Sequence, residues 1–172
     1  MKKLTISQKL DRILEILEPK APVVQDNLRT IVDDGKQKTS EIIAEMRKLF
    51  KVWIYDEKNV DKEFPAPEYP TSRKFRNIQE ADPDMANKSA NDLEKESIKG
   101  ITLRERLLFE LAYFKETDEH LDVENLTLCS GSRYSDGRVP GVRWDARDGR
   151  VGVGWYDADY RYSYMRGRVA VS

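Results

Sequence analysis

Residues 139–156 read "VPGVRWDARDGRVGVGWY" and predict two β-strands joined by a tight turn. The "RDG" run at 147–149 is a turn signal between the two strands. Strand side chains alternate between two faces with a period of two residues. One face of the predicted hairpin therefore carries only Val and Trp: Val142, Trp144, Val151, Val153 and Trp155. We expect this face to be buried.

The opposite face of the hairpin has a different composition. It carries Gly141, Arg143, Asp145, Gly152, Gly154 and Tyr156. Glycine is a poor strand residue, because it loses the most conformational entropy on folding and packs no side chain. Two outward glycines on one strand therefore indicate a display surface rather than a stabilising one. The alternative is that Gly152 and Gly154 admit another backbone or form bulges.

Two further runs extend the predicted sheet, and a helix precedes it. The runs are 125–131, "NLTLCSG", and 165–171, "MRGRVAV", both rich in strand-forming residues. The helix reads "TLRERLLFELAYFKE" and opens with Thr102 and Glu105 at the spacing of a capping box. Its apolar side comprises Leu103, Leu107, Leu108, Leu111 and Phe114. This part of the chain predicts a helix plus a small antiparallel β-sheet.

The first 54 residues show three short amphipathic helical patterns. Apolar residues recur at helical spacing over 5–18, 24–32 and 39–53. Their apolar stripes are narrow, which suits pairing of these helices with each other or with copies in other subunits. We expect residues 1–54 to be a helical assembly or docking region that makes a homo-oligomer.

Residues 55–100 differ from both neighbours, with four Pro, many charges and little periodicity. Such a composition buries too little apolar surface to offset its ordering entropy. We expect a charged linker or extended arm, with a short helix near 90–98. Residues 101–172 then form a ligand-display domain. The predicted fold class is α+β, with N-terminal amphipathic helices, a linker, and a C-terminal helix plus a small antiparallel sheet.

The composition changes along the chain. Lys and Glu disappear after Glu124, and seven of the nine Gly lie after residue 130. Residues 1–127 hold 22 basic and 26 acidic side chains, a net charge of −4, whereas residues 128–172 hold 8 and 5, a net charge of +3. This asymmetry is compatible with a nucleic-acid partner but too weak to require one. The difference in composition indicates that residues 1–127 and 128–172 serve different functions.

The start of the chain reads "MKKLTISQKLDRILEIL" and lacks the apolar core of about 7–15 residues that a signal peptide needs. No segment approaches the roughly 20 apolar residues of a membrane span. We therefore expect no membrane partner, and a location in a cytoplasm or in a phage particle assembled there.

The residues that usually carry catalysis or bind metals are scarce. A single Cys129 forms no internal disulfide, and together with the single His120 it makes a poor zinc site. We interpret Cys129 as a small buried residue and His120 as a surface residue at a helix end. Asp157 and Asp159 are interpreted as solvated loop residues rather than cation ligands. The sequence predicts a protein that is not an enzyme and holds no metal or cofactor.

Four motifs in residues 101–172 carry a resemblance to a known family. "SGSRYSDG", "VPGVRW", "VGVGWY" and "RGRVAV" follow the predicted helix in this order. The region resembles the C-terminal hypervariable domain of the variable proteins of diversity-generating retroelements, of the phage and prophage type. In that group a reverse transcriptase mutagenises template adenines that are copied into the gene. The resemblance implies a C-type-lectin-like fold whose variable residues bind diverse ligands.

The genetic code offers an independent check on this resemblance. Randomising both adenines of an AAC codon yields Asn, Tyr, Asp, His, Ser, Gly, Arg, Cys and other residues, but never Lys, Glu, Gln, Trp or Met. Every residue that we place on the open face or in its loops is reachable, and Lys, Glu and Gln are absent from 128–172. The two Trp and the Met of this region lie at positions that we infer to be scaffold.

The residue types of the open positions suit recognition. Tyr and Arg dominate binding hot spots, and Tyr with Ser, Gly and Asp is typical of antibody paratopes. The predicted ligand-binding residues are Tyr134, Asp136, Arg138, Arg143, Asp145, Gly152, Gly154, Tyr156, Asp157, Asp159, Tyr160, Arg161, Tyr162 and Tyr164. We expect a protein or glycan ligand. The alternatives are a single-stranded nucleic-acid-binding module that uses Tyr and Arg, and a structural component of a phage particle.

Overall fold

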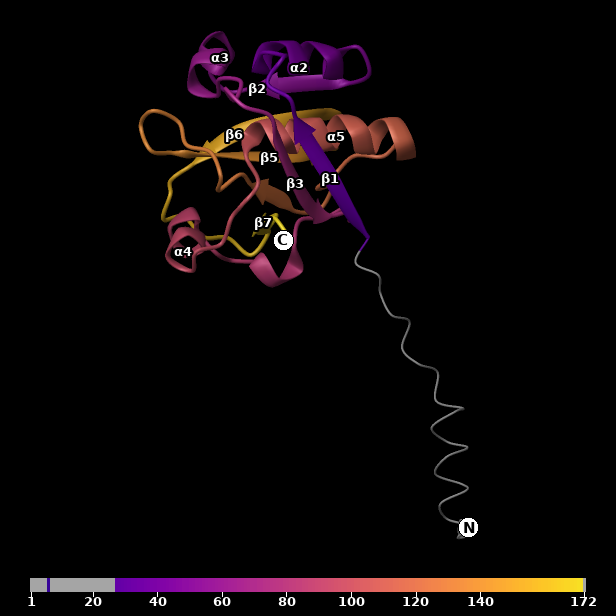
Figure 1. The fold of residues 1–172 in the computed structure, drawn as a ribbon, viewed down its shortest axis with the longest axis vertical. Coiled ribbons are helices and arrows are strands. Elements are labelled where there is room, and N and C mark those ends of the chain that lie inside the picture. The colour runs from indigo at the N-terminus through magenta and orange to yellow at the C-terminus, as the bar shows by residue number, and fades with distance from the viewer. Residues whose placement is uncertain (1–5, 7–26, 172) are drawn as a thin grey trace.

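The computed structural model describes Ile6 and residues 27–171, which form an α+β fold (Figure 1). The strands are β1 (Leu28–Asp33), β2 (Lys51–Ile54), β3 (Thr71–Arg76), β4 (Leu126–Leu128), β5 (Val139–Asp145), β6 (Arg150–Tyr156) and β7 (Met165–Gly167). The helices are α2 (Thr39–Arg47), α3 (Val60–Glu63), α4 (Ala90–Lys95) and α5 (Leu103–Thr117), with short 3-10 helices at Glu57–Asn59 and Pro83–Met85.

Five strands form the central sheet in the order β2-β6-β5-β4-β7. The predicted hairpin is confirmed, since β5 pairs antiparallel with β6 from Val139 opposite Tyr156 to Asp145 opposite Arg150. The purely antiparallel sheet is wrong: β2 runs parallel to β6, and β7 runs parallel to β4. The sheet is therefore mixed, and its edge strand β2 comes from the N-terminal third of the chain.

The predicted inner face of the sheet is largely in the core. Val142, Val151 and Val153 have no exposed surface and pack with apolar residues of α2 and α5. Trp144 is half-buried, but Trp155 is 40% exposed, so its expected burial is wrong. Trp155 lies near the C-terminal end of β6, where Tyr55 rather than a helix adjoins it, with 6.0 Å between the ring centroids.

Helix α5 is predicted correctly, with Thr102 and Glu105 forming its capping box. It lies between the central sheet and a second, two-stranded sheet in which β1 pairs antiparallel with β3 (Figure 1). Because both sides of α5 are covered, polar as well as apolar residues of this helix are buried: Leu103, Arg104, Glu105, Arg106, Leu107, Phe109 and Glu110.

The helical predictions for the start of the chain hold only in part. The pattern over 24–32 is wrong in the described residues, because 28–33 form β1. The third pattern gives α2 and then a strand, β2, which adds an edge to the central sheet. Helix α2 packs into the core of the same chain. The pattern over 5–18 lies outside the described residues, except for Ile6.

The linker interpretation of 55–100 is wrong. This segment supplies β3, α3 and α4, the last of which matches the short helix expected near 90–98. Its side chains enter the core, where Phe75 and Leu93 have no exposed surface and Phe64 is 6% exposed. The few apolar residues of the segment are enough to order it, because they pack against a core built by the rest of the chain.

A buried ionic cluster joins α5 to the C-terminal end of the chain. The guanidinium of Arg106 donates to Asp122 Oδ2 at 2.8 Å and to Glu110 Oε2 at 2.7 Å. Arg168 donates to Asp122 Oδ1 at 3.0 Å and to two backbone carbonyls. All four side chains are at most 1% exposed. Two cations thus offset two carboxylates, which lets these charges be buried.

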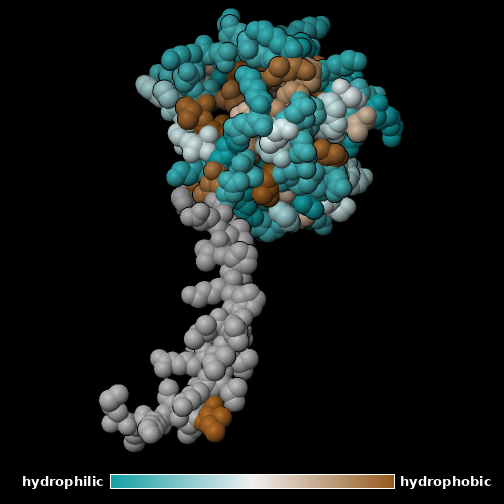
Figure 2. Space-filling view, turned by 90° about the vertical axis from the view of Figure 1, so that its right-hand side faces the viewer, coloured by the Kyte–Doolittle hydropathy of each residue, from teal (hydrophilic) through white to brown (hydrophobic). Residues whose placement is uncertain are grey.

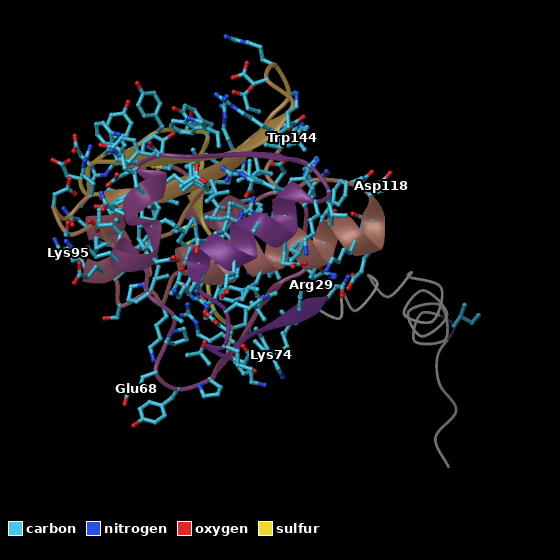
Figure 3. All side chains as sticks on the ribbon, turned by 90° about the horizontal axis from the view of Figure 1, so that it is seen from above. Arg29, Glu68, Lys74, Lys95, Asp118 and Trp144 are labelled. Atoms are coloured by element: carbon cyan, nitrogen blue, oxygen red, sulfur yellow. The ribbon has the colours of Figure 1, made fainter. Side chains whose placement is uncertain are left out.

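His120 belongs to this cluster rather than to the surface, which corrects the sequence interpretation. Its Nδ1 lies 2.9 Å from Glu110 Oε1, and its ring stacks on Trp144 with 3.6 Å between centroids. Phe114 stacks on the ring as well, at 4.8 Å. Figure 3 shows Trp144 at the same corner of the molecule as Asp118, which ends α5.

The molecular surface is mainly hydrophilic on the face drawn in Figure 2, with isolated hydrophobic patches. Among the described residues, no helix is both long enough and apolar enough to cross a membrane.

Candidate functional site

The outer face of the central sheet, which carries Gly141, Arg143, Gly152 and Gly154, is covered over only half of its area. Ala90 of α4 packs with Leu126, Val139 and Met165 in a second apolar cluster. The loop 157–164 joins this cover, since Ala158 O accepts a hydrogen bond from the backbone of Asn91. The outer face of β6 and β2 lies beyond this cover. The candidate site is built on that uncovered half.

Gly152 and Gly154 form the floor of the uncovered half. A Cβ atom at either position would meet no heavy atom within 4 Å. Neither residue has a positive φ, and the pairing of β5 with β6 continues through both without a bulge. The alternative that these glycines admit another backbone or form bulges is therefore wrong within the described residues. Neither backbone conformation nor packing requires glycine here.

Two large side chains flank this floor. Arg143 on β5 is exposed and lies directly opposite Gly152. Trp53 on β2 lies opposite Gly152 on the other side and is 43% exposed. We call Trp53, Arg143, Gly152 and Gly154 the glycine strip. Trp53 was missed because 39–53 was interpreted as one helix, although buried Val52 and Ile54 around it follow a strand period.

Four tyrosines form a row beside the strip. The ring centroids are 6.1 Å apart from Tyr156 to Tyr160, 4.6 Å from Tyr160 to Tyr162, and 5.1 Å from Tyr162 to Tyr164. Tyr160 is 38% exposed and Tyr162 is 42% exposed. A hydrogen bond with Tyr162 raises the pKa of Tyr160 to about 12. We call these four residues the tyrosine row; Tyr160 and Tyr162 present their rings to solvent.

Tyr156 belongs to this row and also packs against the sheet. It is half-buried, and burial raises its pKa. Its ring covers Gly141, where an added Cβ would lie 2.5 Å from Tyr156 Cε2. Gly141 is thus fixed by packing, in contrast to Gly152 and Gly154.

The structure places Asp136 and Arg138 away from the glycine strip. Arg138 lies over the Trp155 ring, 3.9 Å from its centroid, and forms an ion pair of 2.7 Å with Asp136. This pairing raises the pKa of Arg138 and lowers that of Asp136. Trp155 shares the inner face of β6 with Val153, so these residues form a separate corner. The fourteen predicted residues do not form one surface.

Tyr134 is a core residue, which corrects its prediction as a ligand contact. It is 6% exposed, and its ring packs edge-on against Phe64 with 4.9 Å between centroids. Its hydroxyl donates to the backbone carbonyl of Gly154 at 3.3 Å. Burial raises the pKa of this hydroxyl.

The remaining predicted residues lie at the end of β5 or in the loop 157–164. Asp145 accepts a hydrogen bond from the backbone N–H of Arg147 at 3.1 Å and so shapes the β5–β6 turn. Arg161 forms an ion pair of 2.5 Å with Asp92 of α4, which lowers the pKa of Asp92 and anchors the loop 157–164. Asp157 and Asp159 are exposed, and no group of three or more His, Cys, Asp or Glu in the described part of the chain is placed to hold a metal ion.

Comparisons with known proteins add no identification: the chain matches no protein-family model, no curated protein and no solved structure.

Proposed function

We propose that the protein is a non-enzymatic ligand-binding protein that recognises a partner protein or a glycan through the glycine strip and the tyrosine row. One observation carries the proposal. Side chains would fit at the positions of Gly152 and Gly154. Neither packing nor backbone conformation requires glycine at these two positions. A surface that the fold does not need is free to change with the ligand.

The exposed groups around the strip support this proposal. Tyr160, Tyr162 and Trp53 each expose about two fifths of their surface. Such rings provide large, rigid contact area at low cost in conformational entropy. Arg143 is exposed on the same face of the sheet as Trp53, and Arg and aromatic residues are the side chains that dominate binding hot spots.

We further propose that this surface is diversified by a reverse transcriptase, as the family resemblance implies. Arg143, Tyr160, Tyr162 and both strip glycines are residues that randomised AAC codons reach. A C-type-lectin-like fold and display in several copies belong to the same proposal; several copies would add avidity. Comparing the 3′ end of the gene with flanking DNA should reveal a near-copy that differs only at adenines. Absence of both a near-copy and an adjacent reverse transcriptase gene would contradict diversification.

Single-stranded nucleic acid is a weaker candidate ligand. The arginines that would contact phosphates are mostly neutralised: Arg138 pairs with Asp136, Arg150 with Asp148 and Arg161 with Asp92. Binding of nucleic acid depends on free cations that displace condensed counterions.

A five-residue variant tests the binding proposal. Arg143, Gly152, Gly154, Tyr160 and Tyr162 are changed together to Ser, and both proteins are applied to arrays of purified bacterial surface proteins and of glycans. The wild type should bind array members that the variant does not bind, because hot-spot side chains carry most of the binding free energy. Equal signals for the two proteins, or no signal for the wild type, would contradict the proposal.

A further inference from the structure

Arg143 differs from the other arginines of the candidate surface. Arg138, Arg150 and Arg161 each lie within 3.0 Å of a carboxylate oxygen. Within residues 27–171, no carboxylate lies within ion-pair distance of Arg143, although its side chain is exposed. It also stands on a sheet strand rather than on a loop, so its Cα is held in place. The strip thus offers one unneutralised guanidinium.

The space beside Arg143 is open. Gly152 lies directly opposite it, and no heavy atom lies within 4 Å of the Cβ position at Gly152 or Gly154. Trp53 follows on the next strand. Two strand spacings separate Arg143 from Trp53, which is about 10 Å. The glycine floor between them therefore leaves open space for side chains of a partner.

The opposite wall of this space is aromatic. Trp53 is 43% exposed, and Arg150 lies over its ring at 5.5 Å from the centroid. The charge of Arg150 is offset by Asp148 at 2.9 Å. The strip therefore combines an aromatic wall on one side with a free cation on the other.

We propose that the glycine strip binds an acidic side chain next to an aromatic one on an exposed loop of a partner protein. This inference rests on the proposed function and names its partner. The carboxylate pairs with Arg143, whose planar guanidinium matches carboxylate geometry. The neighbouring aromatic side chain packs on Trp53. A protein is favoured over a glycan because the adjoining tyrosine row has the composition of a protein-binding paratope.

The test is a titration of the 15N-labelled full chain with two blocked peptides, followed by amide and indole chemical shifts. Ac-Phe-Glu-Gly-NH2 should shift the amides of Gly152 and Gly154 and the indole of Trp53. Ac-Phe-Gln-Gly-NH2, which differs only in charge, should bind about tenfold more weakly, as expected for loss of one charge-assisted hydrogen bond.

Variants at Arg143 complete the test. Arg143→Gln should remove the preference for the Glu peptide, and Arg143→Lys should retain part of it; unchanged shifts elsewhere will show that both variants fold. Equal binding of the two peptides at the strip would overturn acidic recognition while leaving the proposed function standing. Strip shifts with N-acetylneuraminic acid but not with the Glu peptide would overturn the protein partner in favour of a glycan. No strip shift with any probe would overturn the inference.

Discussion

Replacing Asp122 by Asn should lower the free energy of unfolding by about 3–5 kcal/mol, as removal of one member of a buried ionic cluster does. Asp122 is fully buried, and Arg106 and Arg168 both donate to it. Its φ is +54°, a conformation that Asn also tolerates. The loss of stability therefore comes from the missing charge rather than from backbone strain. Urea unfolding followed by tryptophan fluorescence measures it.

Asp118 provides a matched control for this substitution. It also has a positive φ, +59°, but is exposed. Asp118→Asn should change the free energy of unfolding by no more than about 0.5 kcal/mol. Comparable losses for the two variants would contradict the stabilising role of the cluster.

The same carboxylate makes stability depend on pH. Burial acts to raise the pKa of Asp122, but Arg168 and Arg106 outweigh it, so the pKa lies below its ordinary value. A depressed carboxyl pKa contributes stability above the unfolded value of about 4 and loses it as the pH falls through the folded value. The wild type should therefore lose more stability than Asp122→Asn between pH 7 and pH 3.

Replacing Phe75 by Ala should cost about 3–5 kcal/mol, the usual loss for a buried Phe. Phe75 has no exposed surface and packs in the main core, with Arg73 over its ring at 5.4 Å. It lies in the segment whose composition predicted a linker. The free energy of unfolding from urea titration checks the result.

Tyr69 is the control from the same segment. It is 72% exposed, so Tyr69→Ala should leave stability within about 0.5 kcal/mol of the wild type. If Phe75→Ala were equally neutral, residues 55–100 would not contribute to the core.

Local signals made the C-terminal half predictable. The Thr102–Glu105 capping box fixed the start of α5, and the "DG" turn fixed the β5–β6 hairpin. Strand β1 was mistaken for a helix because its buried side is partly polar. Asp33 points inward and pairs with Arg104, which breaks the apolar alternation. An ion pair between residues 71 positions apart leaves no local pattern in the sequence.

The candidate site was predictable in its residues but not in their roles. Alternation along β5 and β6 placed Arg143, Gly152 and Gly154 on the open face, as found. It could not show that Gly141, on the same face, is covered by Tyr156. Nor could it add Trp53, because β2 joins the sheet from a distant part of the chain. Which residues are covered, and which strands form the edge of the sheet, depend on contacts between distant parts of the chain.

The central claim is that the binding surface can be exchanged without loss of the fold. A library randomised together at Arg143, Gly152, Gly154, Tyr160 and Tyr162 tests it, when displayed on yeast and sorted for protease resistance. Most members should resist protease as well as the wild type does, because the fold does not use these side chains.

A second library randomised at Gly141 alone is the control. Most of its members should be cleaved, since an added Cβ would lie 2.5 Å from Tyr156 Cε2 and 2.9 Å from Leu126 Cδ2. Widespread cleavage of the five-position library, at the level of the Gly141 library, would show that the surface is part of the scaffold and would contradict the account.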